Sequence, residues 1–279
     1  MYPSSNLITG TFKNNEGQNL FYRNWKIAAD PKAVVLIVHG FNSHSGYYQD
    51  FALHLNENQF EVYAIDLRGR GHSEGERYFI KDYRNVIDDI NKLSNIVKMI
   101  YPELPLFIFG HSAGGVFASV YAARYQQKLQ GLISESFAFE IPAPGFALTL
   151  IKLLAHIIPR MRLIKLNNKD FSRDEIVVNT LNNDPLVAEE KQPVKTMQQL
   201  LLASVFLRKV IPEIKLPLLV LHGTGDKATL PAGSIYFMKN AGSVDKQLEL
   251  YDGYFHDLLN DKDNGIVVGD IVSWLNERI

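Results

Sequence analysis

The sequence predicts an α/β fold in which a mostly parallel central sheet carries helices on both faces. Continuous apolar, β-branched runs such as Ala33–Val38 are typical of strands buried on both faces of a parallel sheet. Segments with helical spacing separate these runs, as expected for a doubly wound sheet. The alternation stops at about Phe137 and resumes at about Pro212, with no convincing strand between them. We therefore expect a core made of residues 1–137 and 212–279, and an inserted helical cap at 138–211.

The expected elements follow one another in a regular order along the chain. Two strands, Asn6–Lys13 and Asn19–Lys26, are joined by the polar turn Asn14–Gly17. Further strands are expected at 33–38, 60–65, 106–109, from 131, at 216–221 and at 247–251. Core helices are expected at 47–56, at 82–100, through 116–122, from 231, and at 265–278.

The composition is that of an ordinary globular protein. The 279 residues are 46% hydrophobic and 21% charged, with a net charge of −1, so no global field favours nucleic acid or an anionic membrane. The absence of cysteine excludes disulfides, cysteine catalysis and cysteine-ligated metal. Met1–Asn6 lacks the features of a signal peptide, and no uncharged run reaches the roughly 18 residues that a spanning helix needs. We expect a cytoplasmic protein without a protein partner, for which a peripheral membrane contact stays open.

The stretch Leu106–Gly115 is predicted to be a buried strand, a tight turn and the start of a helix. Within it, Gly110-His111-Ser112-Ala113-Gly114 matches the G-x-S-x-G nucleophile elbow, which exposes a serine at the end of a parallel strand. A second match, at 71–75, lies in a polar loop without that strand-to-helix context. Context therefore favours Ser112 as the nucleophile and makes Ser73 a chance match. Glu74 occupies the third glycine position of a G-x-G-x-x-G pattern in the same loop, which argues against a nucleotide site.

A nucleophilic serine needs a base and an acid that orients the base. On such a sheet the acid follows a late strand and the histidine follows the last strand. Asp226 and His256 stand at these positions. Taken singly, Asp226 also suits a turn or a helix cap, and His256 suits a surface position. The agreement of order and strand-end placement predicts a catalytic triad of Ser112, Asp226 and His256.

Two backbone N–H groups are needed to stabilise the oxyanion that forms when the serine attacks. Ala113 follows the nucleophile, and Phe41 lies in the loop after the third strand, so these two residues are the predicted donors. The histidines show no H-E-x-x-H or other metal-binding spacing, and we expect neither a metal nor a cofactor. The histidines expected to support loops around the site are His39, His44, His72 and His111.

The predicted insertion contains two interpretable segments. Ser172–Glu175 has the S-x-x-E pattern of a capping box, so a helix should begin there and end near Pro185. The segment 145–158 is strongly apolar, with Thr149, Lys152 and His156 in one polar stripe. It is interpreted either as a cap helix packed on the core or as a lid that lines an acyl channel and touches a lipid surface. One helix can do both on different faces, and Ile151 is a candidate contact for substrate.

Several motifs resemble those of the monoacylglycerol lipase and lysophospholipase branch of the α/β hydrolases. The matching stretches are His39-Gly40, 44–48, 66–75, 110–115, 172–174, 184–187, Gly223 with Asp226, and 256–260. The resemblance runs from about residue 19 to the C-terminus and includes the insertion. It implies an α/β-hydrolase fold and a carboxylester hydrolase with a helical cap over an apolar acyl pocket. It also implies Ser112, Asp226 and His256 as the triad, with Phe41 and Ala113 as oxyanion donors.

The sequence departs from the pattern of this branch at two places. Asn42 and Ser43 stand where these lipases usually have Gly and Glu, and Glu135 stands in a turn that is usually small and apolar. A carboxylate at Glu135 would disfavour a purely apolar acyl chain or point to solvent. The expected substrate is a monoacylglycerol, a lysophospholipid or another medium-to-long acyl ester. Thioesterase, aryl esterase or peptidase activity with the same triad, or a non-catalytic ligand-binding protein of the same fold, are the alternatives.

Overall fold

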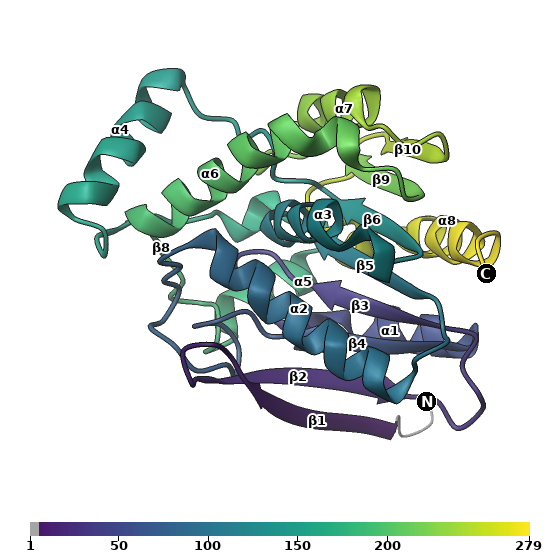
Figure 1. Ribbon diagram of the computed structural model, residues 1–279. Helices are drawn as coiled ribbons and strands as arrows, with labels where there is room; N and C mark the ends of the chain where they lie inside the picture. Colours follow the sequence, from purple (N-terminus) through teal and green to yellow (C-terminus); the bar gives the residue numbers. More distant parts are fainter. Residues whose placement is uncertain (1–5) are drawn as a thin grey trace.

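The computed structural model describes residues 6–279 and contains one eight-stranded sheet (Figure 1). The first five residues, on which the expectation of no signal peptide rests in part, lie outside the described residues. The strands are β1 (Asn6–Lys13), β2 (Asn19–Lys26), β3 (Ala33–Val38), β4 (Phe60–Ile65), β5 (Leu106–His111), β6 (Gly131–Glu135), β9 (Leu218–Gly223) and β10 (Lys246–Tyr251). Their order in the sheet is β1-β2-β4-β3-β5-β6-β9-β10. Strands β1 and β2 pair antiparallel with their neighbours and all other pairs are parallel, which confirms the predicted fold class.

Helices cover both faces of this sheet because side chains alternate between the faces along each strand. The core helices are α1 (Gln49–Glu57), α2 (Tyr83–Ile100), α3 (Ala113–Tyr125), α7 (Pro231–Asn240) and α8 (Gly265–Asn276). Figure 1 shows α2 and α3 in front of the sheet and α1 behind it. In β3, Val34 and Leu36 join the hydrophobic cluster under α2, α3 and α7, whereas Val35 and Ile37 join the cluster under α1 and α8.

The chain between β6 and β9 adds no strand to the large sheet in the part of the chain that the structure describes. Its elements are α4 (Gly145–Ile157), β7 (Arg162–Ile164), α5 (Glu175–Asn183), β8 (Gln192–Pro193) and α6 (Val194–Val210). The pairing of β7 with β8 shows that the expectation of no strand here is wrong. These strands are too short to show an alternating pattern in the sequence. The division of the chain into a core and a separate cap stays a prediction.

The short connections include five 3-10 turns, and two helix starts differ in detail from expectation. The turns are η1 (Ser45–Tyr48), η2 (Gln126–Lys128), η3 (Asn168–Asp170), η4 (Ile211–Glu213) and η5 (Leu258–Asn260). Helix α1 follows η1 directly, so it begins later than predicted. Helix α5 is capped by Asp174, which accepts a hydrogen bond from the Ile176 N–H, and not by Ser172. The Ser172 hydroxyl accepts from the Asp174 N–H and donates to the carbonyl of Asn260, which ties this segment to the loop after β10.

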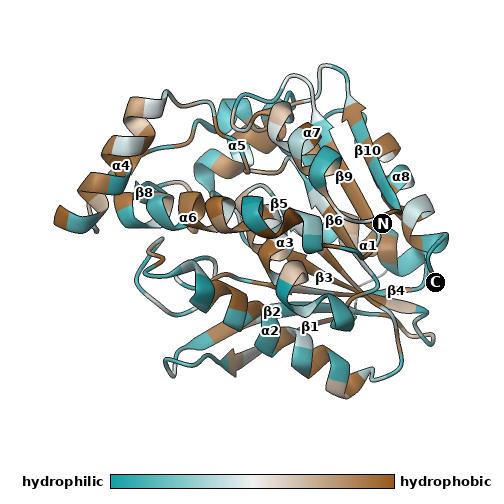
Figure 2. Ribbon diagram, turned by 45° about the horizontal axis from the view of Figure 1, so that its top comes forward, coloured by the Kyte–Doolittle hydropathy of each residue, from teal (hydrophilic) through white to brown (hydrophobic). Residues whose placement is uncertain are grey.

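Helix α4 lies at the outer edge of the molecule beside α6 (Figure 1). Figure 2 shows hydrophobic stretches along this outlying helix. Ala155 is buried and Ile151 packs partly buried against the core, whereas Thr149, Lys152 and His156 are exposed. Within residues 6–279, no helix combines the length and the apolar character needed to cross a membrane.

Candidate active site

Ser112 occupies a sharp turn between β5 and α3. Its backbone has φ 55° and ψ −120°, a conformation that non-glycine residues rarely adopt and that costs of order 1–3 kcal/mol. The Ser112 N–H donates to the Glu135 carbonyl at 2.9 Å, which holds the turn against the end of β6. A Cβ on Gly114 would lie 2.1 Å from the Val38 carbonyl oxygen, and one on Gly110 would lie 2.6 Å from that of Gly114. The two glycines are therefore required by close backbone approach around the serine.

Asp226 and His256 form a buried hydrogen bond after β9 and β10. His256 Nδ1 lies 2.8 Å from Asp226 Oδ2. A carboxylate accepts only, so the ring proton is assigned to Nδ1 and the lone pair to Nε2. Asp226 Oδ1 also accepts from the N–H groups of Ala228 and Thr229, at 2.7 and 3.0 Å.

Burial by itself would raise the pKa of Asp226. The electrostatic attraction of His256 lowers this pKa, and so do hydrogen bonds from His222, His256 and Thr229. These effects outweigh that of burial. Together they hold the pKa of this carboxyl well below its usual range. The carboxylate is therefore ionised at neutral pH and can orient His256 and stabilise its protonated form.

Two further side chains contact Asp226 Oδ2. The Thr229 hydroxyl donates to it at 2.6 Å, and His222 Nε2 lies at 3.2 Å. The other ring nitrogen of His222 lies 2.7 Å from the Ser234 hydroxyl. Sequence reasoning assigned no role to His222 or Thr229. The sequence contains only a weak indication of this role, because nothing except the closeness of these two residues to Asp226 along the chain suggests a contact.

The parallel strands bring Ser112, Asp226 and His256 to the same edge of the sheet, because β5, β9 and β10 all end there. The His256 ring is held between two rings. Its centroid lies 4.9 Å from that of His111, which directly precedes Ser112, and 4.9 Å from that of Phe171 in an edge-on contact. The imidazole is therefore buried and oriented next to the elbow.

The loop that carries Phe41 runs beside the serine. A Cβ on Gly40 would lie only 2.8 Å from the Ser112 Cβ. The Leu67 N–H donates to His39 Nε2 at 2.9 Å, so Nδ1 carries the proton and donates to the Gly40 carbonyl at 2.7 Å. Burial lowers the pKa of His39 to about 4, which keeps this neutral tautomer at neutral pH. His39 thus supports the loop, as expected.

Side chains from other segments also contact the loop that carries Phe41. The Arg70 guanidinium stacks on the Phe41 ring at 4.3 Å and bonds to Gln192 at 2.7 Å. His44 accepts from the Gly46 N–H and faces Asp184 at 2.9 Å, so it too supports a loop. Ala113 is the first residue of α3, where backbone N–H groups lack helical partners.

Ser73, the serine of the second G-x-S-x-G match, has its hydroxyl engaged in the backbone. It donates to the Asp66 carbonyl at 2.5 Å and accepts from the Phe21 N–H at 2.8 Å. No strand leads into this serine and no helix follows it directly. Its role in the described structure is to hold a loop against β2.

Glu135 lies at the end of β6 and is fully buried, so the expectation that it points to solvent is wrong. Its Oε1 accepts from the N–H groups of Leu258 and Leu259, at 2.6 and 3.3 Å. Burial, with the nearby carboxylate of Asp257, raises the pKa of Glu135 well above its usual range. A side chain in this position contacts the loop that carries His256 and has no exposed surface with which to line an acyl pocket.

A cavity of about 300 Å³ opens between the end of β6, α4 and α6. Its lining is mainly apolar and comprises Ala138, Phe139, Glu140, Ile141, Leu148, Leu200, Leu201, Arg208 and Leu230. The cavity begins close to the elbow, because the Ala138 N–H donates to the Ser112 carbonyl at 3.2 Å. Ile151, the predicted substrate contact, is not among the residues that line it.

Several known proteins are similar to this chain in sequence and in fold. The family described as serine aminopeptidase, S33 matches residues 29–263. Rat monoglyceride lipase is 33% identical over 95% of this chain and 89% of its own length. A monoacylglycerol lipase from Mycolicibacterium smegmatis is 30% identical over 98% of each chain. The crystal structure of the Paleococcus ferrophilus monoacylglycerol lipase has a TM-score of 0.85 and 29% identity, over 93% of this chain and 99% of that one.

The matched region includes every strand from β3 to β10 together with the chain between β6 and β9. It therefore contains the elbow, the loop of Phe41 and the buried pair of Asp226 and His256. Family, curated relatives and solved structure agree over nearly the whole chain. The chain belongs to this family and is a serine hydrolase of the α/β-hydrolase fold.

Proposed function

We propose that the chain hydrolyses acyl esters of the monoacylglycerol or lysophospholipid type, with Ser112 as nucleophile, His256 as base and Asp226 as the residue that orients the base. The observation that carries this assignment is the buried 2.8 Å hydrogen bond between Asp226 and His256 beside the strained turn of Ser112. This arrangement leaves His256 Nε2 as the atom able to accept the serine proton.

The proposed reaction proceeds through an acyl-enzyme. His256 Nε2 takes the proton of Ser112 Oγ as the oxygen attacks the ester carbonyl, and the N–H groups of Phe41 and Ala113 hold the oxyanion. The leaving alcohol receives the proton from His256. Water, activated by the same nitrogen, then cleaves the acyl-enzyme and releases the acid. Asp226 stays ionised throughout and stabilises the imidazolium.

The proposed acyl site is the cavity between the end of β6, α4 and α6. Its lining is mostly leucine and phenylalanine, and its volume of about 300 Å³ suits a single acyl chain. Arg208 and Glu140, which pair at 3.0 Å, provide the charged groups in this lining. The names of the relatives from rat and Mycolicibacterium smegmatis support a monoacylglycerol as the first substrate to test.

The reaction is tested with a chain-length series of p-nitrophenyl esters and monoacylglycerols, together with an active-site-directed fluorophosphonate. We expect turnover of medium and long acyl esters, and one covalent adduct that peptide mass spectrometry places on Ser112. An adduct on Ser73 with Ser112 unmodified would overturn the nucleophile assignment. Saturable binding of an ester without turnover would favour the ligand-binding alternative, and thioester or peptide turnover alone would favour the other hydrolases.

A contact with lipid surfaces through α4 is also proposed. Four large apolar side chains lie exposed on this helix: Phe146 at 77%, Leu150 at 48%, Leu153 at 59% and Ile157 at 68%. Their spacing of three or four residues puts them on one side of the helix. An exposed apolar face of this kind is typical of interaction surfaces.

This contact is tested by sedimentation with phosphatidylcholine vesicles. The double variant Phe146→Ser/Leu153→Ser should bind vesicles less than the wild type while keeping turnover of a soluble short-chain ester. Val244→Ser, which changes a fully exposed apolar residue far from α4 in the chain, is the matched control and should leave vesicle binding unchanged. Equal vesicle binding by the double variant and the wild type would contradict the proposed contact.

A further inference from the structure

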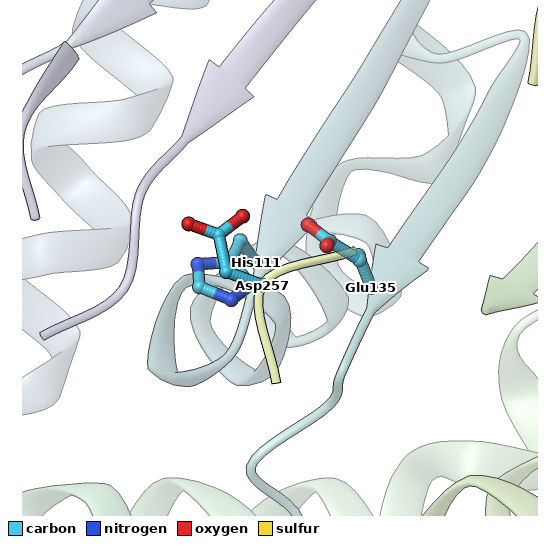
Figure 3. A group of neighbouring side chains, drawn as sticks. All are labelled: His111, Glu135 and Asp257. Atoms are coloured by element: carbon cyan, nitrogen blue, oxygen red, sulfur yellow. The ribbon is translucent and has the colours of Figure 1, made fainter. Parts of the chain in front are cut away.

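Three ionisable side chains meet beneath the loop that carries His256. His111 comes from the end of β5, Glu135 from the end of β6 and Asp257 from the loop after β10. One ring nitrogen and one oxygen from each carboxylate all lie within 4.8 Å of one another. Figure 3 shows the Glu135 carboxylate directed toward His111 and Asp257. The three segments are far apart in sequence, which is why no metal-binding spacing is visible there.

Two of the donor atoms have no partner, although they are buried. His111 is 2% exposed and Glu135 is 0% exposed, yet His111 Nε2 and Glu135 Oε2 make no hydrogen bond. A buried polar atom without a partner costs about 1–3 kcal/mol. Both atoms belong to side chains whose donor groups come within 4.8 Å of one another, and an ion bound among the three side chains would give each atom a partner.

The remaining atoms of the same side chains are held in place by neighbours. Glu135 Oε1 accepts from two backbone N–H groups of the loop, and the Asn260 amide donates to both oxygens of Asp257 at 3.0 Å. The His111 ring hydrogen-bonds to the backbone of His256. Such outer contacts, which fix the orientation of an imidazole and of carboxylates, are typical of metal ligands.

We propose that His111 Nε2, Glu135 Oε2 and one carboxylate oxygen of Asp257 bind a divalent transition-metal ion, with Zn²⁺ as the best-matched ion. An imidazole with two carboxylates suits Zn²⁺, whereas Mg²⁺ and Ca²⁺ prefer sites made of oxygen alone. The two carboxylates balance the charge of the ion. Tetrahedral Zn²⁺ with bonds of 2.0–2.2 Å needs donors about 3.3–3.6 Å apart. Donor pairs near the 4.8 Å limit would therefore move together by up to about 1.5 Å on binding.

An approach from solvent exists on the side of Asp257. This residue, with Asn260, lines a surface cavity of about 240 Å³ that is otherwise formed by η1, the start of α1 and α5. A bound ion would link the ends of β5 and β6 to the residue that follows His256. The site is therefore structural, and it would hold the His256 loop on the sheet without contacting substrate.

The test uses the full chain, dialysed against EDTA, with ZnCl₂ as the probe. We expect one equivalent of Zn²⁺ to bind in isothermal titration calorimetry, an unfolding midpoint raised by several degrees, and much weaker binding of Mg²⁺ and Ca²⁺. Co²⁺ should give the visible absorption of a tetrahedral site. None of these measurements needs turnover, so their failure is separate from a failure of the proposed hydrolase activity. A folded wild-type chain that binds no Zn²⁺ would overturn the proposal.

Matched variants locate the site. Glu135→Gln keeps an oxygen able to accept from Leu258 but removes the charged ligand, and Asp257→Asn does the same at a less buried position. Each should weaken Zn²⁺ binding at least about tenfold. Asp184→Asn, which changes the carboxylate paired with His44 at 2.9 Å, is the control and should keep the affinity and the stoichiometry. Unchanged binding in both ligand variants, or an anomalous map of Zn²⁺-soaked crystals with only water between His111 and Glu135, would refute the assignment.

Discussion

The pattern G-x-S-x-G occurs at 71–75 and at 110–114, and its two serines have opposite surroundings. Ser112 sits at φ 55° between a buried strand and a buried helix. Ser73 lies in a loop, and its hydroxyl both donates to and accepts from backbone groups. A hydroxyl with both functions engaged is a poor candidate for nucleophilic attack, because attack would first have to break those bonds.

The glycines of the two copies are needed for reasons that only partly overlap. Gly110 and Gly114 permit close approach, since a Cβ on either would meet backbone atoms within 2.6 Å. Gly71 and Gly75 have φ of +52° and +122°, which a side chain would strain, and a Cβ on Gly71 would also lie 2.1 Å from Asp66 Oδ2. The same residue types thus permit two kinds of backbone, and the neighbouring elements decide which one forms.

Among the substitutions that test this comparison, Ser112→Ala should have the largest effect on activity. Removal of the proposed nucleophile should lower kcat for esters at least about 10³-fold and, by the behaviour of other serine hydrolases, up to about 10⁶-fold. Steady-state kinetics with a p-nitrophenyl ester measures the loss, and thermal unfolding checks that the variant is folded. Full turnover by a folded Ser112→Ala would remove the distinction between the two copies.

Asp226→Asn should have the next largest effect, a loss of about 10⁴-fold in kcat. An asparagine amide in place of the carboxylate cannot hold the His256 tautomer that leaves Nε2 free, and it cannot stabilise the imidazolium. KM should change far less than kcat, because the Asp226 side chain is buried and has no exposed surface with which to contact substrate. Thr224→Val is a control expected to keep kcat. Thr224 lies on the same loop as Asp226, and its hydroxyl donates to Asp252 and accepts from the Gly253 N–H on the loop after β10.

The pH profile of kcat/KM tests the pair of Asp226 and His256. Because the pKa of Asp226 is depressed, its carboxylate contributes stability above the unfolded pKa of about 3.9, and this stability is lost only as pH falls through the still lower folded pKa. The acid limb of activity should therefore contain no contribution from protonation of Asp226. The logarithm of kcat/KM should fall with a slope of one, and a slope of two would contradict an ionised Asp226.

Gly114→Ala should cost several kcal/mol of unfolding free energy, since its Cβ would lie 2.1 Å and 2.5 Å from the carbonyl oxygens of Val38 and His39. Denaturant unfolding measures the effect. Gly269→Ala, in α8 with nothing within 4 Å of the added Cβ, is the matched control. It should be neutral or stabilising by up to about 1 kcal/mol. Similar values for both variants would contradict the close approach at the elbow.

Ser73→Ala should have the smallest effect. Loss of its two hydrogen bonds should lower the unfolding free energy by about 1–2 kcal/mol and leave kcat unchanged. Ser273→Ala, at an exposed position of α8, should change stability by less than about 0.5 kcal/mol. A large loss of kcat in Ser73→Ala, with the fold intact, would make the second copy part of the active site.

The elements that sequence reasoning located best are those with strong periodicity. The run Ala33–Val38 and the spacing in Tyr83–Ile100 match β3 and α2 closely. The pair β7 and β8 was missed because two or three residues show no period. The N-cap of α5 was assigned to Ser172 because the S-x-x-E pattern does not distinguish Ser172 from Asp174, which is also a good N-cap residue. In the structure Asp174 accepts from the Ile176 N–H, and Ser172 Oγ accepts from the Asp174 N–H just before the helix.

The sequence by itself determined the α/β class, the family and the candidate residues Ser112, Asp226 and His256, because apolar periodicity and strand-end motifs are local properties of the chain. Only the tertiary structure decided what surrounds them. The sharing of Asp226 by His222 and Thr229, and the burial of Glu135 against the loop of His256, depend on which strand ends meet at the sheet edge. Contacts between segments far apart in sequence leave no local pattern, so the fold alone brings such side chains together.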